Sequence, residues 1–234
     1  MRDLAPVISR GLLLVFVFAS LQSAAQDGVC PDRSNAEPAR LIDSDVQKRR
    51  VANLSPPWRG DEQFRFTWFS GYVGVDGRLD GICCYSSSKQ ISSSESRDLR
   101  EKLKDLRFTP ATDNGEKLEA YVSFTIIGVK TDSGIEARMF LNQLRSKEEF
   151  GIDYIAPQRI GVFGAFASSR IRGEYALDVD VRGTPSNARI TQWHMGSDGA
   201  RDGLLEHVSQ KCFIPGKVNN QPVAMPYFEV IQRS

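Results

Sequence analysis

The feature that most constrains this chain is an internal repeat at a spacing of 105 residues. In both stretches an amphipathic helix pattern is followed by a turn and then by an alternating strand. The stretches align without a gap, which predicts that one folding unit occurs twice. The matched positions are Leu99 and Leu204, Leu103 and Val208, Phe108 and Phe213, Pro110 and Pro215, Asn114 and Asn219, and Ile126 and Ile231.

The first predicted unit covers residues 62–145. Apolar residues alternate over 64–68, the Asp76-Gly77 pair predicts a two-residue hairpin turn, and a second strand returns over 79–85. A Ser92-x-x-Glu95 capping box then predicts a helix start. The helix buries Leu99, Leu103 and Leu106, and the strand after it buries Leu118, Ala120, Val122, Phe124 and Ile126.

After a turn at 131–134, apolar residues alternate again at Ile135, Ala137, Met139 and Leu141. This pattern predicts a strand added to the first sheet, and a helix over 136–150 is the alternative. Residues 146–171 are charged and irregular, so they are predicted to connect the two units, with a possible short strand at 159–163.

The second predicted unit covers residues 172–234. Its first strand places Tyr175, Leu177, Val179 and Val181 inward and Glu174, Asp178 and Asp180 outward. The chain turns at 183–187 and returns over 188–193. Asp198 is predicted to cap a helix that carries Leu204, Leu205 and Val208. The last strand alternates Val223, Met225, Tyr227 and Ile231, with Glu229 as an interruption.

These patterns predict an α+β protein made of two tandem β-β-α-β units. Each unit is expected to be a small antiparallel sheet covered by one helix, because a sheet needs an apolar helix face to cover its own apolar face.

The first 25 residues have the features of a cleavable signal peptide. Arg2 and Arg10 give positive charge, residues 11–19 are apolar, and Ala24-Ala25 offers a cleavage site, so the mature chain is expected to begin near Gln26. The alternative is an uncleaved inner-membrane anchor, for which the apolar run is short. Residues 26–61 are polar and predicted to be a linker with a short helix at 38–51.

Export makes the cysteines informative, because disulfides form in oxidising compartments. The four cysteines Cys30, Cys83, Cys84 and Cys212 allow three connectivities for two bridges. Cys83 and Cys84 are adjacent on a predicted strand and point to opposite faces. One structural bridge with one buried thiol is favoured over a vicinal redox pair.

Composition argues against several function classes. The chain has 30 basic and 29 acidic side chains in 234 residues, which gives no footprint for nucleic acid. His194 and His207 lie in different predicted elements, without a Cys/His cluster, so no metal site is predicted. The sequence has no nucleophile elbow, P-loop or dinucleotide motif, so we expect neither an enzyme nor a bound cofactor, and no catalytic residues are assigned.

The order strand, turn, strand, helix, then Phe213-x-Pro215-Gly216 with Pro222-Val223 before a closing strand, resembles the TonB C-terminal domain family. The second copy is the better match, because Ala111 and Lys117 replace the usual Gly and Pro in the first. The resemblance implies protein–protein contact in the Gram-negative periplasm and energy transduction to outer-membrane transporters. It also implies that an edge strand pairs with an extended partner segment.

A periplasmic protein-binding module that uses its last strand as an edge is therefore the predicted function. The partner would be an outer-membrane or periplasmic protein. One alternative is a TonB-like energy transducer or an accessory in transmembrane transport. Another is a structural periplasmic protein whose two units pack on each other. Pro222 and Pro226 narrow the predicted partner-binding residues to Tyr227, Phe228, Glu229, Val230, Ile231 and Gln232.

Overall fold

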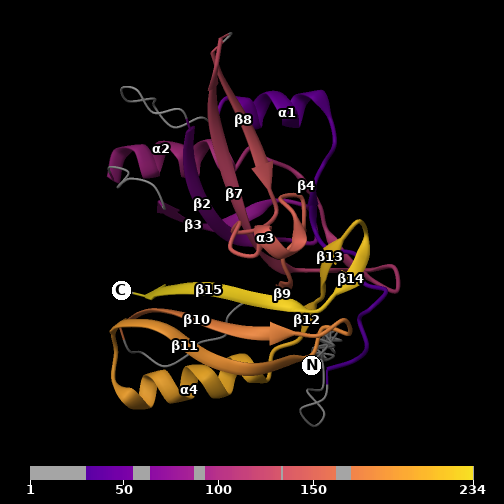
Figure 1. The fold of residues 1–234 in the computed structure, drawn as a ribbon, viewed down its shortest axis with the longest axis vertical. Helices are drawn as coiled ribbons and strands as arrows, with labels where there is room; N and C mark the ends of the chain where they lie inside the picture. The colour runs from indigo at the N-terminus through magenta and orange to yellow at the C-terminus, as the bar shows by residue number, and fades with distance from the viewer. Residues whose placement is uncertain (1–29, 55–63, 87–92, 133, 162–169, 234) are drawn as a thin grey trace, which may run out of the picture.

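The computed structural model describes residues 30–54, 64–86, 93–132, 134–161 and 170–233. In these residues the protein is an α+β fold with mainly antiparallel strands and four helices. Two sheets lie one above the other, each with its own helical cover (Figure 1). The strand at the top of the lower sheet, β15, runs beneath the upper one.

The upper sheet, called the first sheet here, has the strand order β12-β9-β7-β2-β3, and β8 also pairs with β7. The pairing of β8 confirms the predicted added strand and excludes the helical alternative over 136–140. The strands are β2 (Phe64–Val73), β3 (Leu79–Ser86), β7 (Ala120–Thr131), β8 (Gly134–Phe140), β9 (Gln158–Ile160) and β12 (Phe213–Ile214).

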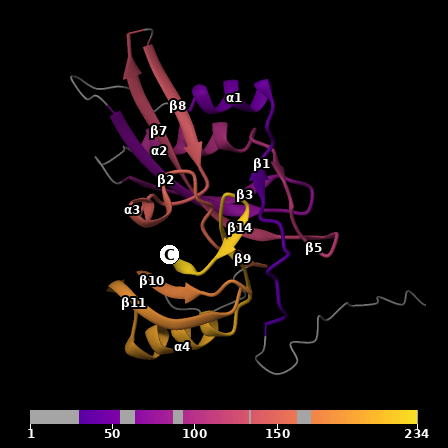
Figure 2. The ribbon, with the colours of Figure 1, turned by 45° about the vertical axis from the view of Figure 1, so that its right-hand side comes forward.

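The second sheet has the order β11-β10-β15, and the long helix α4 lies along it (Figures 1 and 2). The first sheet is covered by α2 and α1. The strands of the second sheet and these helices are β10 (Ile171–Val179), β11 (Pro185–Met195), β15 (Met225–Arg233), α1 (Asp45–Ala52), α2 (Ser93–Leu103) and α4 (Asp198–Ser209); a single turn, α3, spans Lys147–Phe150.

Short paired strands form the remaining elements. One pair joins the N-terminal segment to the chain just after α2. Two small hairpins follow the two long helices, α2 and α4. These strands are β1 (Arg40–Leu41) with β4 (Phe108–Thr109), β5 (Ala111–Asp113) with β6 (Glu116–Leu118), and β13 (Gly216–Val218) with β14 (Gln221–Val223).

Element boundaries recur at the spacing seen in the sequence. The bounds of β4, β5 and β6, moved by 105 positions, coincide with those of β12, β13 and β14. Both small hairpins turn through an asparagine with φ of 50°, Asn114 and Asn219. The β2–β3 and β10–β11 hairpins match at a spacing of 106 residues. The three-residue turn within each hairpin ends at a glycine, Gly77 in the first and Gly183 in the second.

These two glycines explain why the hairpin turns have this form. Both have positive φ, 77° at Gly77 and 84° at Gly183. The carbonyl of Gly77 accepts from Phe108 N–H, and the carbonyl of Gly183 accepts from Phe213 N–H. A Cβ at either position would lie 2.2 Å or 2.0 Å from the oxygen of that phenylalanine. Glycine is therefore required by both backbone conformation and close approach.

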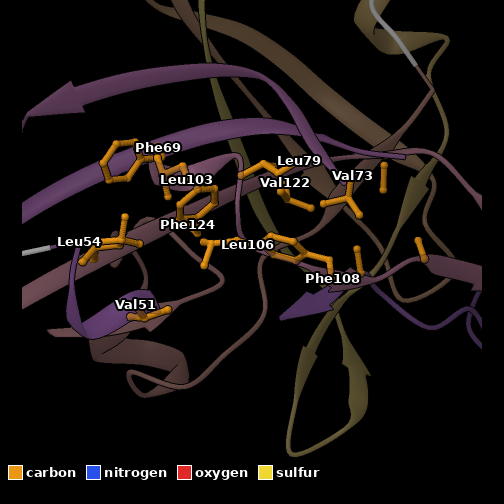
Figure 3. Close-up of a cluster of buried hydrophobic side chains, with 14 of the residues drawn as sticks. Val51, Leu54, Phe69, Val73, Leu79, Leu103, Leu106, Phe108, Val122 and Phe124 are labelled. Carbon is orange, nitrogen blue, oxygen red and sulfur yellow. The ribbon is translucent and has the colours of Figure 1, made fainter. Parts of the chain in front are cut away.

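The first hydrophobic core lies between the first sheet and its helices (Figure 3). Phe69 and Phe124 stack with their ring centroids 5.4 Å apart, and Phe108 packs beside them. Burying each such side chain contributes about 1.5–3 kcal/mol. Other members are Val51, Leu54, Val73, Leu79, Leu99, Leu103, Leu106, Val122 and Ile126.

The second core lies between the second sheet and α4, and it includes two buried residues of the first sheet, Tyr121 on β7 and Phe213 on β12. Phe213 contacts Tyr227 edge to face at 4.9 Å. The other buried members are Ile171, Tyr175, Leu177, Val179, Ala200, Leu204, Val208 and Ile231. The helix begins at Asp198, and its N-cap is Ser197, whose side chain accepts from Ala200 N–H, so the predicted cap at Asp198 is corrected by one residue.

Other turn predictions are also corrected. The Asp76-Gly77 turn is a three-residue loop rather than a two-residue one, because Gly74 N–H donates to the carbonyl of Arg78. The second hairpin turns at 180–184, earlier than the predicted 183–187, since Asp180 N–H donates to Thr184. The capping box at Ser92 lies outside the described residues.

Residues 30–54, predicted as part of a linker, are packed structure instead. Ala36 and Ala39 are fully buried, and Gln158 donates to and accepts from the backbone of Ala39. The helix α1 begins at Asp45, later than the predicted residue 38. Two kinds of contact hold this polar segment in place. A few apolar side chains are buried, and the backbone pairs with β4 and β5.

A disulfide joins Cys30 to Cys212, so the N-terminal segment is tied to the second sheet region. This bridge selects one partner for Cys30, which the sequence left open. It is compatible with an exported protein. The predicted signal peptide lies outside the described residues. Within the described ranges, no helix is both long enough and apolar enough to cross a membrane.

Candidate partner-binding edge

The last strand, β15, ends the strand order of the second sheet, as the sequence predicted for a partner-binding edge. Pro226 lies opposite Asp178 and has no N–H to donate, so this is one of the non-hydrogen-bonded pairs of the antiparallel ladder. Because hydrogen-bonded and non-hydrogen-bonded pairs alternate, the even-numbered residues of β15 direct their backbone N–H and C=O groups away from β10. The carbonyl of Phe228 follows this alternation, because it accepts from Gln143 Nε2 at 2.7 Å. The outer edge of β15 therefore carries the backbone groups of residues 228, 230 and 232.

The six predicted partner-binding residues lie along this strand but divide between its two faces. Tyr227, Glu229 and Ile231 point into the second core and are 2%, 4% and 8% exposed. Phe228 and Val230 lie on the opposite face and are partly buried. The side chain of Gln232 lies outside the described part of the chain. Recognition at this strand would thus depend on backbone groups more than on side chains.

Glu229 is held by a charge from outside its own sheet. Arg159, on β9 of the first sheet, donates to both carboxylate oxygens at 3.0 Å, and its side chain is fully buried. Tyr175 and Tyr227 donate to the same carboxylate oxygen, at 2.5 Å and 2.6 Å. The Arg159 guanidinium also lies 4.9 Å from the ring centre of Tyr121. A buried pair with this many hydrogen bonds satisfies both charges.

The titration of this cluster follows from its burial. Burial by itself would lower the pKa of Arg159. The charge of Glu229, the hydrogen bond to its carboxylate and the neighbouring Tyr227 and Tyr175 together outweigh burial and raise that pKa. Burial, followed by the negative charge of Glu229, raises the pKa of Tyr175 and of Tyr227 well above the ordinary value. Both tyrosines therefore remain neutral hydrogen-bond donors over the physiological pH range.

A second ion pair joins the end of the first predicted unit to the second sheet. Arg145 donates to Glu174 at 2.8 Å and 2.5 Å, and its guanidinium lies 5.1 Å from the Trp68 ring and 4.7 Å from the Phe228 ring. Burial would raise the pKa of Glu174, but the hydrogen bonds from Arg145 and Thr191, together with the charge of Arg145, outweigh it and lower the pKa. Glu174 was predicted to face solvent; it is 5% exposed because Arg145 covers it.

Sequence reasoning missed Arg159 and Arg145, which come from the predicted connection and the end of the first predicted unit. The interruption of an apolar strand face by Glu229 was a usable signal, because a buried carboxylate requires a partner. Nothing in the local sequence identifies that partner, since Arg159 is 70 residues away.

The corresponding strand of the first sheet, β7, has both parts of its outer edge occupied. It pairs with β8 from Thr125 to Thr131 and with β9 at Ala120 and Tyr121. In the described part of the chain, no strand pairs in the same way with the outer edge of β15.

Other candidate chemistry is sparse. Cys83 is a half-buried free thiol on β3, and the side chain of Cys84 lies outside the described residues. Among the described residues, no three or more His, Cys, Asp or Glu side chains gather in a metal-binding arrangement.

Comparisons with protein-family models, with curated proteins and with solved structures each found no match to this chain.

Proposed function

We propose that this protein is an exported periplasmic binding module in which two TonB C-terminal-like units are joined in tandem. The units correspond to β2–β8 and β10–β15. Its partner is a protein of the periplasm or outer membrane that adds an extended segment to the outer edge of β15. The recurrence of strand and turn positions at a spacing of 105–106 residues supports the tandem arrangement.

The observation that carries the proposal is the contrast between equivalent edges. In the first unit, β8 supplies a strand to β7 along residues 125–131. The matching positions in the second unit begin at residue 230 of β15, and β15 is the edge strand of its sheet. Strand addition by a partner would repeat between molecules the pairing that the first unit makes within the chain.

The contacts of the first unit limit where a partner can pair. Gln143 already occupies the outer carbonyl of Phe228, and Arg145 covers the Phe228 ring. Pro226 offers no donor. Val230 already has a contact within the structure. The pairing region is therefore the very end of β15, from residue 231 to residue 233.

The test compares Gln232→Pro with Gln232→Ala. Both variants remove the side chain, but only proline removes the outward N–H. Affinity capture from a periplasmic extract should yield a partner with the wild type and with Gln232→Ala, and lose it with Gln232→Pro at an unchanged melting temperature. Equal capture by both variants would sink strand addition at this edge. Val230→Pro is a poorer choice, because Val230 already has a contact within the structure.

A second candidate function is a structural protein whose two units pack on each other. The observation that favours it is the buried Arg159–Glu229 pair, which joins the two sheets. In this case no captured protein would depend on Gln232. Arg159→Met would then impair the function of the protein in the cell, whereas Gln232→Pro would leave that function intact.

A TonB-like energy transducer is a further variant of the first proposal, and it requires that the N-terminus stays in the membrane. N-terminal sequencing that gives Met1 rather than a residue near Gln26 would favour it.

A further inference from the structure

A polar side chain of β7, Ser123, is buried between the two sheets. Side chains of a strand alternate between its faces, so Tyr121 and Ser123 share the face opposite to that of Phe124. Phe124 belongs to the first core and Tyr121 to the second, which directs Ser123 towards the second sheet. Ser123 is 5% exposed, and its hydroxyl has no hydrogen-bond partner among the described residues.

A second unpaired oxygen belongs to Gln143, in the segment that follows β8. The preceding residue fixes this segment, because the fully buried Asn142 donates to the carbonyls of Ile152 and Tyr154. The Gln143 amide donates through Nε2 to the carbonyl of Phe228 at 2.7 Å. Its other end, Oε1, is buried and accepts no hydrogen bond from the described part of the chain.

The orientation of the Gln143 amide follows from this contact. A flipped amide would direct Oε1 at the Phe228 carbonyl, so that two acceptors would face each other and Nε2 would lose its acceptor. Oε1 therefore requires a donor other than Phe228. Leaving a buried acceptor without a donor is costly, and nearly all such groups in folded proteins have a partner.

Ser123 and Gln143 line the same small cavity, which has a volume of about 10 Å³. This is the lower end of the about 10–15 Å³ that one water molecule requires. Tyr154, Tyr227 and Phe228 also line the cavity. Its described lining includes no acidic or basic side chain, so an ion bound there would have no charge to balance its own.

We propose that one water molecule binds in this cavity, between the two sheets. It accepts a hydrogen bond from the Ser123 hydroxyl and donates one to Gln143 Oε1, so each unpaired group gains the partner that it lacks. With Oε1 held by the water and Nε2 by the Phe228 carbonyl, the Gln143 amide is fixed at the outer edge of β15. The water site does not depend on the function proposed for β15.

A crystal structure of the mature protein that shows ordered water is the direct test. We expect a water molecule within about 2.5–3.2 Å of both Ser123 Oγ and Gln143 Oε1, and we expect Ser123→Ala to lose it. A direct hydrogen bond between Ser123 and Gln143 would overturn the site, as would the lack of electron density for a water between them.

A double-mutant cycle tests the bridge in solution. Ser123→Ala and Gln143→Met each remove one partner of the same water, so their effects on the unfolding constant should not multiply. We expect a departure of at least about twofold from independent effects, as is usual for residues that share a partner. Urea denaturation of the two single variants and the double variant measures it.

Ser70→Ala is the matched control for Ser123→Ala. Ser70 lies opposite Ser123 on β2 and is 2% exposed, but its hydroxyl already accepts from Tyr121 at 2.6 Å. Ser70→Ala and Gln143→Met should therefore act independently. Independent effects in both cycles would overturn the bridge. Equal coupling in both cycles would assign it to general packing of this face and would overturn the bridge as well.

Discussion

The two sheets place different chemistry at equivalent points. In the first sheet Phe69 lies opposite Phe124, and the two rings stack inside an apolar core. In the second sheet Tyr175 lies opposite Glu229, and both are hydrogen bonded within the Arg159 cluster. The apolar pair closes its own core, whereas the polar pair requires a cation from the other sheet. The difference shows that matching positions of the two sheets can hold an apolar pair in one sheet and, in the other, a polar pair that depends on a charge from the neighbouring sheet.

The strand edges differ in the same direction. The first sheet extends itself with β8 and β9, while the second ends at β15. The outer edge of β7 is thus paired with other strands of the fold, whereas the outer edge of β15 pairs with no strand in the described part of the chain.

The largest expected effect comes from replacing the polar pair by the apolar one. Glu229→Phe should destabilise the protein by about 3–5 kcal/mol, because Arg159 is left buried without its carboxylate. Adding Arg159→Met should recover much of this loss, since an apolar group then fills the site. Urea denaturation of the single and double variants measures both quantities. No recovery in the double variant would show that the unpaired charge of Arg159 does not cause the loss.

Phe213→Ala and Phe108→Ala test whether equivalent aromatic residues carry equal weight. Both side chains are at most 1% exposed, and truncation of a buried phenylalanine costs about 3–5 kcal/mol. Similar losses in the two variants, read from the denaturation midpoint, would support the tandem arrangement. Unchanged midpoints for both would contradict the repeat.

A smaller effect is expected at the hairpin glycines. Gly77→Ala and Gly183→Ala should each cost about 1–3 kcal/mol from the positive φ, and the contact with a phenylalanine carbonyl adds to this. Gly115→Ala is the matched control, because Gly115 has φ of 83° but a Cβ added there would meet no atom within 4 Å. Its loss of stability, measured by the same urea denaturation, should be smaller than either of the others. Equal losses at all three positions would mean that close approach contributes nothing.

The smallest effect is a pH dependence confined to the second sheet. The pKa values of Tyr175 and Tyr227 are raised on folding, so the folded state holds their protons more tightly than the unfolded state. Their contribution to stability is complete below the unfolded pKa of about 10 and is lost as the pH rises above it. The melting temperature should therefore be steady up to about pH 10 and fall progressively as the pH is raised further.

The variant Tyr175→Phe with Tyr227→Phe should lose part of this alkaline fall. In the first sheet, the equivalent positions hold Phe69 and Val122, which do not titrate. An identical pH profile in the wild type and the double variant would show that these tyrosines do not cause it.

The sequence by itself determined the order of the long strands and helices, the apolar faces of α2, α4 and β7, and the β8 strand. These follow from periodicity, which reports which face of a local element is buried. Turn lengths were less well predicted, because a Gly77 or Gly183 turn depends on a hydrogen bond to a strand about 30 residues further on.

Only the tertiary structure decided which distant groups meet. It paired Cys30 with Cys212, Arg159 with Glu229 and Arg145 with Glu174, and it packed residues 30–54 onto the first core. It also decided that β7 is covered by β8 while β15 ends its sheet. Periodicity carries no information about such contacts, because their energy depends on burial and charge that exist only once the sheets have come together.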